Sequence, residues 1–285
     1  MAITAAQVNE LRQKTGAGMM DCKKALTEAD GDFEKAIEIL RKKGASVASK
    51  RAEKSANEGM VVTKVSDDAK KASIIEVNCE TDFVAKSDDF VKLAAAVVES
   101  AFSASSNNAK ELLEADKNLN DKLVEVMGKV GEKVEVSRVY SQADNNGLFV
   151  DYIHMGSKLG VLVKFDNVTA KNDELVELGK NIAMQVVAMN PISISRDGID
   201  KNIVEKEKEI YLTLAKNENK PDKIAETIVN NKVERFFQDN CLLEQEYINE
   251  SGKSIQDIIA EFNKKDSNNL EIAEIVRYQL GEEIK

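Results

Sequence analysis

The sequence is poor in the residue types on which enzymes and metal proteins depend. Its 285 residues include one histidine, three cysteines and no tryptophan. The cysteines stand far apart, so the chain has neither a Cys-x-x-Cys pair nor any other metal-ligand cluster of recognisable spacing. A Walker-type phosphate loop is absent too, because Gly16-Ala17-Gly18 lies between helical patterns and no Gly-Lys-Ser/Thr follows it. These absences argue against an enzyme, and we expect no metal site and no cofactor.

Long apolar runs are scarce as well, and acidic residues outnumber basic ones by 50 to 40. The formal net charge is -10, whereas sequence-independent binding to nucleic acid or to a membrane surface needs a basic face. We therefore expect a protein partner, with no direct nucleic-acid contact and no membrane contact. The N-terminus lacks a secretory pattern and no run is long enough to span a bilayer. Together with the scattered cysteines, this predicts a reduced, cytoplasmic protein.

The main feature that is present is a segment that occurs twice, 85 positions apart. Residues 85–93 read AKSDDFVKL and residues 170–178 read AKNDELVEL, and each copy follows a β-like apolar run. Ser87 and Asn172 are good N-caps and acidic residues follow both, so each copy predicts a strand that leads into a helix. A repeated strand–helix unit indicates a duplicated fold.

The loop before this helix differs between the two copies. Residues 79–84 read CETDFV, whereas residues 165–169 read FDNVT. A turn from strand to helix does not require Asp-Phe, so we expect function at Asp82 and Phe83. The alternative is structural: Phe83 would pack on the helix that begins after Ser87 as a hydrophobic staple, and Asp82 would be an ordinary turn residue.

At the N-terminus the pattern predicts three short helices. Thr4 and Gln7 form a capping box, the glycines at 16 and 18 interrupt the helix, and Asp32 caps a third helix that is expected to stop at Gly44. Residues 1–54 carry 11 Lys and Arg against 8 Asp and Glu, so this part is +3 and the rest of the chain is -13. Residues 45–59 are rich in Ala, Ser and Lys, as in a flexible or helical linker.

Further along the chain, alternating apolar patterns predict strands, and between 191 and 240 the strand signals vanish. That region predicts an antiparallel helical hairpin with a turn at 217–221. The apolar residues expected to join its two helices are Ile203, Ile210 and Leu214 on one side and Ile224, Ile228, Val229 and Val233 on the other.

The expected fold class is α+β, with a small N-terminal three-helix module, a core of two repeated α+β subdomains, and the helical hairpin as an insertion. The expected boundaries are 1–54 for the N-terminal module and linker, 55–140 for the first core subdomain, 141–190 and 241–285 for the two parts of the second, and 191–240 for the hairpin.

Two longer segments resemble a known family. Residues 15–26 (TGAGMMDCKKAL) and 78–85 (NCETDFVA) are similar to the two signature segments of the bacterial translation elongation factor Ts family, and the resemblance continues in collinear order over nearly the whole chain. It implies a guanine-nucleotide exchange factor that binds elongation factor Tu in its GDP-bound and nucleotide-free states, promotes GDP release and lets GTP enter, without covalent chemistry. It also implies that the N-terminal module is ubiquitin-associated-like and that the hairpin is a coiled coil.

The resemblance assigns roles to particular residues. It implies that an intruding segment lies beside the partner's magnesium and phosphate site, formed by Thr81, Asp82, Phe83 and Val84. It implies that Arg12, Met19 and Met20 contact the nucleotide-binding domain of elongation factor Tu, and that His154 contacts its third domain. From the residues alone, Met19 and Met20 serve equally well as core filler or as an adaptable contact surface, and a lone histidine is more often structural.

Two other classes of function remain open. Cys79, Asp82 and His154 are the residue types of a cysteine hydrolase, although no activating motif surrounds the cysteine. The second alternative is a non-catalytic scaffold that self-associates through the helical hairpin. The sequence leaves open the oligomeric state, the role of the hairpin, and the effect of lacking the further C-terminal helix with which some members of the family continue.

Overall fold

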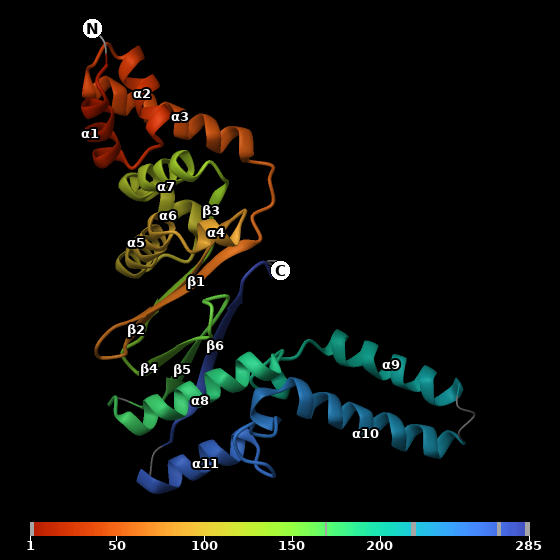
Figure 1. Cartoon of the computed structure of the whole chain (residues 1–285). Coiled ribbons are helices and arrows are strands. Elements are labelled where there is room, and N and C mark those ends of the chain that lie inside the picture. Colours follow the sequence, from red (N-terminus) through yellow and green to blue (C-terminus); the bar gives the residue numbers. More distant parts are fainter. Residues whose placement is uncertain (1–2, 169, 218–220, 267–268, 283–285) are drawn as a thin grey trace.

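The computed structural model describes residues 3–168, 170–217, 221–266 and 269–282, and it shows a mixed α+β protein (Figure 1). Two predicted features lie partly outside the described residues: Thr169 in the second repeat, and positions 218–220 in the turn of the hairpin. Within the described residues, no helix is both long enough and apolar enough to cross a membrane.

The N-terminal module consists of α1 (Ala5–Thr15), α2 (Met19–Glu28) and the first half of α3 (Phe33–Arg51). The predicted capping box is confirmed: Gln7 N donates to Thr4 Oγ1 at 3.3 Å, and Thr4 N donates to Gln7 Oε1 at 3.0 Å. The predicted cap of α3 is also confirmed, since Lys35 N donates to Asp32 Oδ1 at 3.2 Å. Apolar residues of all three helices form a small separate core, among them Leu11, Leu26 and Ala36.

The prediction that α3 stops at Gly44 is wrong. The helix continues to Arg51, and Gly44 is buried where α3 crosses α7 (Lys117–Val130). A Cβ on Gly44 would lie 2.7 Å from the carbonyl oxygen of Val124, and a Cβ on Gly128 would lie 3.0 Å from the Cα of Gly44. Gly44 therefore does not end α3 but permits α3 and α7 to approach closely. As a result, the segment predicted as a linker, residues 45–59, begins as part of a helix.

The first sheet has the antiparallel order β1-β2-β3 and the second the antiparallel order β4-β5-β6. The strands are β1 (Glu58–Val65), β2 (Lys71–Cys79), β3 (Val134–Ala143), β4 (Gly147–Ile153), β5 (Leu159–Asp166) and β6 (Glu271–Gln279). Each sheet has one register shift, next to Glu76 in β2 and next to Lys164 in β5. The two sheets meet through apolar side chains, including Val61 and Ile74 from one and Phe149 and Leu162 from the other.

Helices cover the outer face of each sheet, so the sheets lie in the middle of the molecule (Figure 1). The first sheet is covered by α5 (Asp88–Ala104), α6 (Ala109–Ala115) and α7, and the second by α8 (Asp173–Met189) and α11 (Ile255–Asp266). Both predicted N-caps are confirmed: Phe90 N donates to Ser87 Oγ at 3.4 Å, and Leu175 N donates to Asn172 Oδ1 at 2.8 Å. In the first copy, a one-turn helix, α4 (Asp82–Ala85), stands between strand and helix.

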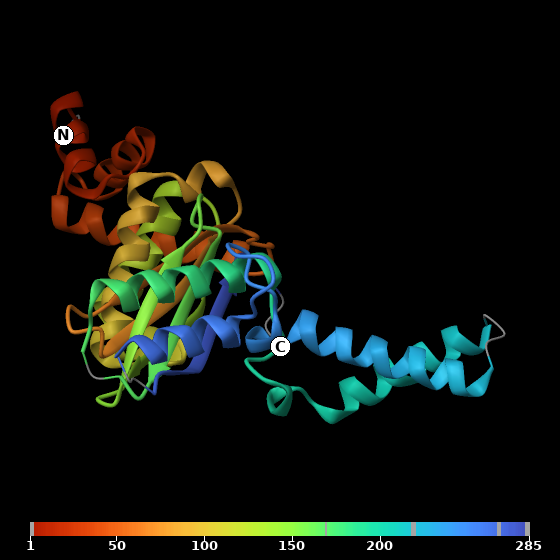
Figure 2. The same ribbon diagram turned by 90° about the horizontal axis from the view of Figure 1, so that it is seen from below.

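The predicted hairpin consists of α9 (Lys201–Asn217) and α10 (Asp222–Asn240), which project together from the core (Figure 2). Most of the residues predicted to join them do not: Ile203, Ile210, Leu214 and Ile224 are exposed, and only Val229 and Val233 of the predicted set are buried. In α9, the contact is made by the residue directly after each predicted one. The residues at the contact are Val204, Tyr211 and Ala215 of α9 and Ala225, Val229, Val233 and Phe237 of α10.

Candidate functional site

Phe83 is presented to solvent on α4, at the end of the first sheet. Its side chain is 83% exposed, so the alternative in which Phe83 packs on α5 as a hydrophobic staple is wrong. Burying a phenylalanine is favourable by about 1.5–3 kcal/mol, and a protein that leaves one almost fully exposed gives up that stabilisation. Isolated exposed apolar residues are common, so the support of the loop that carries Phe83 has to be considered as well.

The loop, residues 81–84, is held by the two residues that flank the half-buried Asp82 and the exposed Phe83. Thr81 donates to Glu132 twice, from its backbone nitrogen at 3.0 Å and from Oγ1 at 2.8 Å, and its hydroxyl caps α4 by accepting from Val84 N. Val84 packs against the core of the first sheet. Thr81 and Val84 therefore anchor the loop, while Asp82 and Phe83 project from it.

A second anchor acts on Glu80, directly before the loop. Its carboxylate accepts from the backbone nitrogen of Lys133 at 2.6 Å and from Arg51 Nη1 at 2.8 and 2.7 Å. The Lys133 hydrogen bond, supported by Arg51, holds the pKa of the Glu80 carboxyl below its usual range. Sequence reasoning missed Arg51, Glu80 and Glu132, because no local pattern links positions about 30 to 50 residues apart.

Asp82 forms an exposed ion pair with Lys86 at 2.8 Å. This hydrogen bond, together with the charges of Lys86 and Lys158, holds the pKa of the Asp82 carboxyl below its usual range. Lys158 stands directly before β5, and its Nζ lies 2.7 Å from Oε2 of Glu58, the first residue of β1. The connection between β4 and β5 therefore lies close to the loop. Because exposed ion pairs are worth little, Asp82 can exchange Lys86 for donors of a partner.

The predicted contact residues of the N-terminal module are on its surface. Met19 is 52% exposed, Met20 is 63% exposed, and Arg12 is exposed as well, so the interpretation of the two methionines as core filler is wrong. Met19 and Met20 open α2, and the module lies at the far end of α3 from α4 (Figure 1). Arg12, Met19 and Met20 are thus distant from Phe83, but α3 runs from their module to the residue that bonds Glu80 beside the loop.

His154 lies just after β4, exposed, with its Nδ1 3.1 Å from the hydroxyl of Tyr152. The next residue, Met155, is 91% exposed and was missed by sequence reasoning. The turn that carries it contains Gly156 at φ 86°, and a glycine after an apolar residue at a strand end is the signal that could have located an exposed hairpin tip. His154 and Met155 therefore project together from one connection.

A cysteine hydrolase is not supported by this geometry. Cys79 is fully buried, and burial raises the pKa of its thiol to about 12, so the sulfur remains protonated at neutral pH. Asp82 bonds Lys86 and His154 contacts Tyr152. Among the described residues, no group of three or more His, Cys, Asp or Glu side chains is arranged to hold a metal ion.

The burial of all three thiols makes a prediction about their reactivity. Cys22, Cys79 and Cys241 have no exposed surface, and burial raises the pKa of Cys241 to about 11. We expect the native protein to react with a thiol reagent such as DTNB at pH 8 far more slowly than the denatured protein, which should release three equivalents at once. A native thiol that reacts within seconds would contradict this arrangement.

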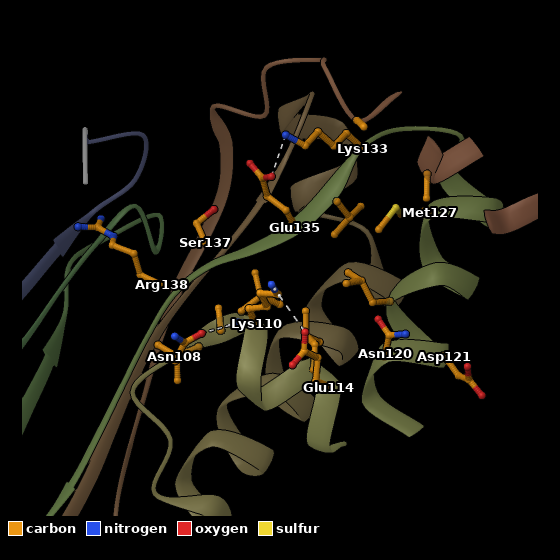
Figure 3. A pocket seen from close by; sticks show the side chains of 18 of the residues that line it. Asn108, Lys110, Glu114, Asn120, Asp121, Met127, Lys133, Glu135, Ser137 and Arg138 are labelled. Carbon is orange, nitrogen blue, oxygen red and sulfur yellow. Dashed lines mark hydrogen bonds and ion pairs between the residues drawn. The ribbon is translucent and has the colours of Figure 1, made fainter. Parts of the chain in front are cut away.

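An open hollow of about 1620 Å³ lies between α6, α7 and the edge strand β3 (Figure 3). Its charged rim includes Lys110, Glu114 and Asp121, and Lys133 pairs with Glu135 at 2.7 Å on β3. It contains none of the predicted site residues. The candidate site is therefore a surface: a rigid loop that displays Asp82 and Phe83, with further exposed residues on the N-terminal module and on the connection after β4.

A firmly held loop with an exposed aromatic residue is typical of a protein that acts by binding another protein. The family model for elongation factor TS matches residues 80–282. Elongation factor Ts of Chlorobium phaeobacteroides is 42% identical over 286 residues, covering 98% of this chain and 99% of that protein. Elongation factor Ts of Clostridium botulinum (strain Okra / Type B1) is 43% identical over 290 residues, covering 99% and 94%. The chain belongs to the elongation factor Ts family.

Proposed function

We propose that this chain releases GDP from elongation factor Tu by inserting Asp82 and Phe83 beside the magnesium and phosphate site of that partner. The exchange role follows from membership in the elongation factor Ts family. The insertion step is supported by one observation above all, the 83% exposure of Phe83 on a loop that Glu132 fixes. An exposed aromatic side chain on a rigid support is suited to enter a pocket of another protein.

Exchange of this kind needs no covalent step. The factor must bind the nucleotide-free partner more tightly than the GDP-bound partner, and by linkage it then weakens GDP binding by the same factor. Burial of Phe83 in a pocket that exists only in the nucleotide-free state supplies about 1.5–3 kcal/mol, or about one to two decades of affinity. Loss of magnesium coordination and docking by the rest of the factor supply the remainder.

Asp82 acts next to Phe83 in this proposal. On insertion its carboxylate leaves Lys86 and accepts from donors that are freed when the magnesium ion is displaced. A carboxylate close to a phosphate also repels it, which favours release. Because the pKa of Asp82 is lowered already in the free protein, the group is charged at neutral pH and no proton has to move.

Two further surfaces would hold the partner during exchange. Arg12, Met19 and Met20 would contact the nucleotide-binding domain, and the exposed methionines suit an adaptable apolar contact. His154 would contact the third domain. With these contacts the factor fixes two parts of elongation factor Tu relative to each other, in the arrangement of the nucleotide-free state.

The same proposal includes the organisation of the chain. Residues 1–54 form a ubiquitin-associated-like module, 55–140 and 141–190 with 241–285 form two subdomains derived by duplication, and 191–240 form a coiled-coil insertion. The identical strand order of the two sheets and the matched register shifts beside Glu76 and Lys164 support the duplication. As a translation factor, the protein would act in the cytoplasm.

The test is release of fluorescent GDP from elongation factor Tu of the same organism, followed by stopped flow. We expect catalytic amounts of the wild-type protein to speed release by orders of magnitude, with GTP loading at the same rate. The scaffold alternative predicts instead a dimer in sedimentation experiments and no change in release. Unchanged release with a factor that is folded by circular dichroism would refute the exchange function.

A further inference from the structure

Arg51, the last residue of α3, forms an ion pair with Glu80, the residue directly before the loop that carries Phe83. Its Nη1 lies 2.8 and 2.7 Å from the two carboxylate oxygens of Glu80, and Glu80 immediately precedes Thr81. From the segment just before β3, the backbone nitrogen of Lys133 donates to the same carboxylate and Glu132 accepts from Thr81. The loop is therefore held between the end of α3 and the start of β3.

The other end of α3 belongs to the N-terminal module. Ala36 is buried in the core of that module, and Gly44 is buried against α7. Since α3 has 19 residues and a helix rises about 1.5 Å per residue, it spans about 28 Å as one continuous element (Figure 1). Because a helix is stiff over this length, α3 fixes the N-terminal module, the crossing with α7 and the base of the loop relative to one another.

We propose that Arg51 is a positioning residue for nucleotide exchange, which fixes Phe83 relative to the N-terminal module through Glu80. The inference rests on the proposed insertion of Phe83. The factor docks one surface on the partner's nucleotide-binding domain and inserts a side chain elsewhere. Release of GDP is faster if the docking surface and the inserted side chain are held at the right separation before binding. Without the Arg51 contact, α3 is no longer tied directly to Glu80, while Glu132 and the backbone nitrogen of Lys133 still hold the loop. The separation between the N-terminal module and Phe83 is then less narrowly defined before insertion, and insertion has to fix it during the reaction.

The Arg51 contact is partly exposed, with the arginine side chain 38% accessible, so its loss should not unfold the protein. We expect Arg51→Gln to lower the maximal rate of GDP release at saturating factor about five- to tenfold. The factor concentration for half-maximal release and the affinity for GDP-bound elongation factor Tu should change less than about twofold. A merely structural role would alter affinity or thermal stability instead of the maximal rate alone.

Three comparisons make the test specific. Lys50→Gln removes a positive charge from the adjacent position, and exposed Lys50 takes part in no ion pair recorded among the described residues, so this variant should match wild type. Glu80→Gln keeps an oxygen that can accept from Lys133 N but removes the negative charge with which Arg51 pairs. It should therefore slow release as Arg51→Gln does, and the double variant should be no slower than either single one. In a Phe83→Ala background, Arg51→Gln should have no further effect.

The possible results separate this inference from the exchange mechanism on which it rests. If Phe83→Ala slows release but Arg51→Gln behaves like Lys50→Gln, the positioning role is refuted and the insertion of Phe83 stands. If Arg51→Gln still slows release in the Phe83→Ala background, Arg51 acts by another route and the inference is also refuted. If Phe83→Ala releases GDP at the wild-type rate, the insertion and the positioning role fail together.

Discussion

Replacing Phe83 by alanine should slow factor-driven GDP release by about 10- to 100-fold while leaving the protein fully folded. The side chain is 83% exposed in the free factor, so its removal loses little packing. Its contribution arises only when it is buried in the nucleotide-free complex, where about 1.5–3 kcal/mol is at stake, equivalent to one to two decades in rate at about 1.4 kcal/mol each. Stopped-flow release of fluorescent GDP at saturating factor measures this directly.

Two companion variants identify what Phe83 contributes. Phe83→Leu keeps most of the apolar surface and should retain a larger share of the activity than alanine. The double variant Asp82→Ala/Phe83→Ala should be slower still, since it also removes the carboxylate that repels phosphate. Thermal unfolding of all three should coincide with wild type within about 2 °C, as for surface substitutions generally. Wild-type release rates in these variants would mean that docking elsewhere drives exchange.

The sequence was a good guide to the starts of the helices, whereas the glycine signal for the end of α3 at Gly44 was wrong because Gly44 packs against α7. The N-caps Thr4, Asp32, Ser87 and Asn172 all accept the hydrogen bonds expected of them, because a cap depends on residues only two or three positions away. The repeat located the loop at Asp82 and Phe83 through the contrast between its copies. The supports of that loop could not be found this way, since Glu132 and Arg51 reach it only through the folded chain.

The hairpin shows a different limit. Each apolar stripe of α9 and α10 is about two residues wide, and helical periodicity alone does not decide which edge faces the other helix. The inner edge carries Ala215 and Ala225, small side chains that let the helices approach, and the larger Ile210 and Leu214 remain outside. The same contact also holds the large side chains Tyr211 and Phe237, so the register depends on how the two helices fit together and not on the apolar pattern of either one.

Gly44→Val is expected to have the largest effect on stability among substitutions in the N-terminal part of the chain. In an isolated helix this change would be neutral or favourable, because glycine is a poor helix former. In the protein, the new Cβ would meet the carbonyl oxygen of Val124 at 2.7 Å, and neither backbone can yield without separating α3 from α7. Overpacking of this kind costs about 1–3 kcal/mol, so thermal unfolding should begin several degrees lower.

Ala45→Val is the matched control, since Ala45 is exposed on the same helix and its replacement costs at most about 0.7 kcal/mol of helix propensity. Gly128→Ala should destabilise the protein in the same direction, because its Cβ would lie 3.0 Å from the Cα of Gly44. The two glycine variants should combine non-additively, as both spread one crossing. Since that crossing also fixes α3 relative to α4, the maximal rate of GDP release should fall along with the melting temperature. Equal melting curves for Gly44→Val and Ala45→Val would show that the contact between α3 and α7 does not contribute to stability.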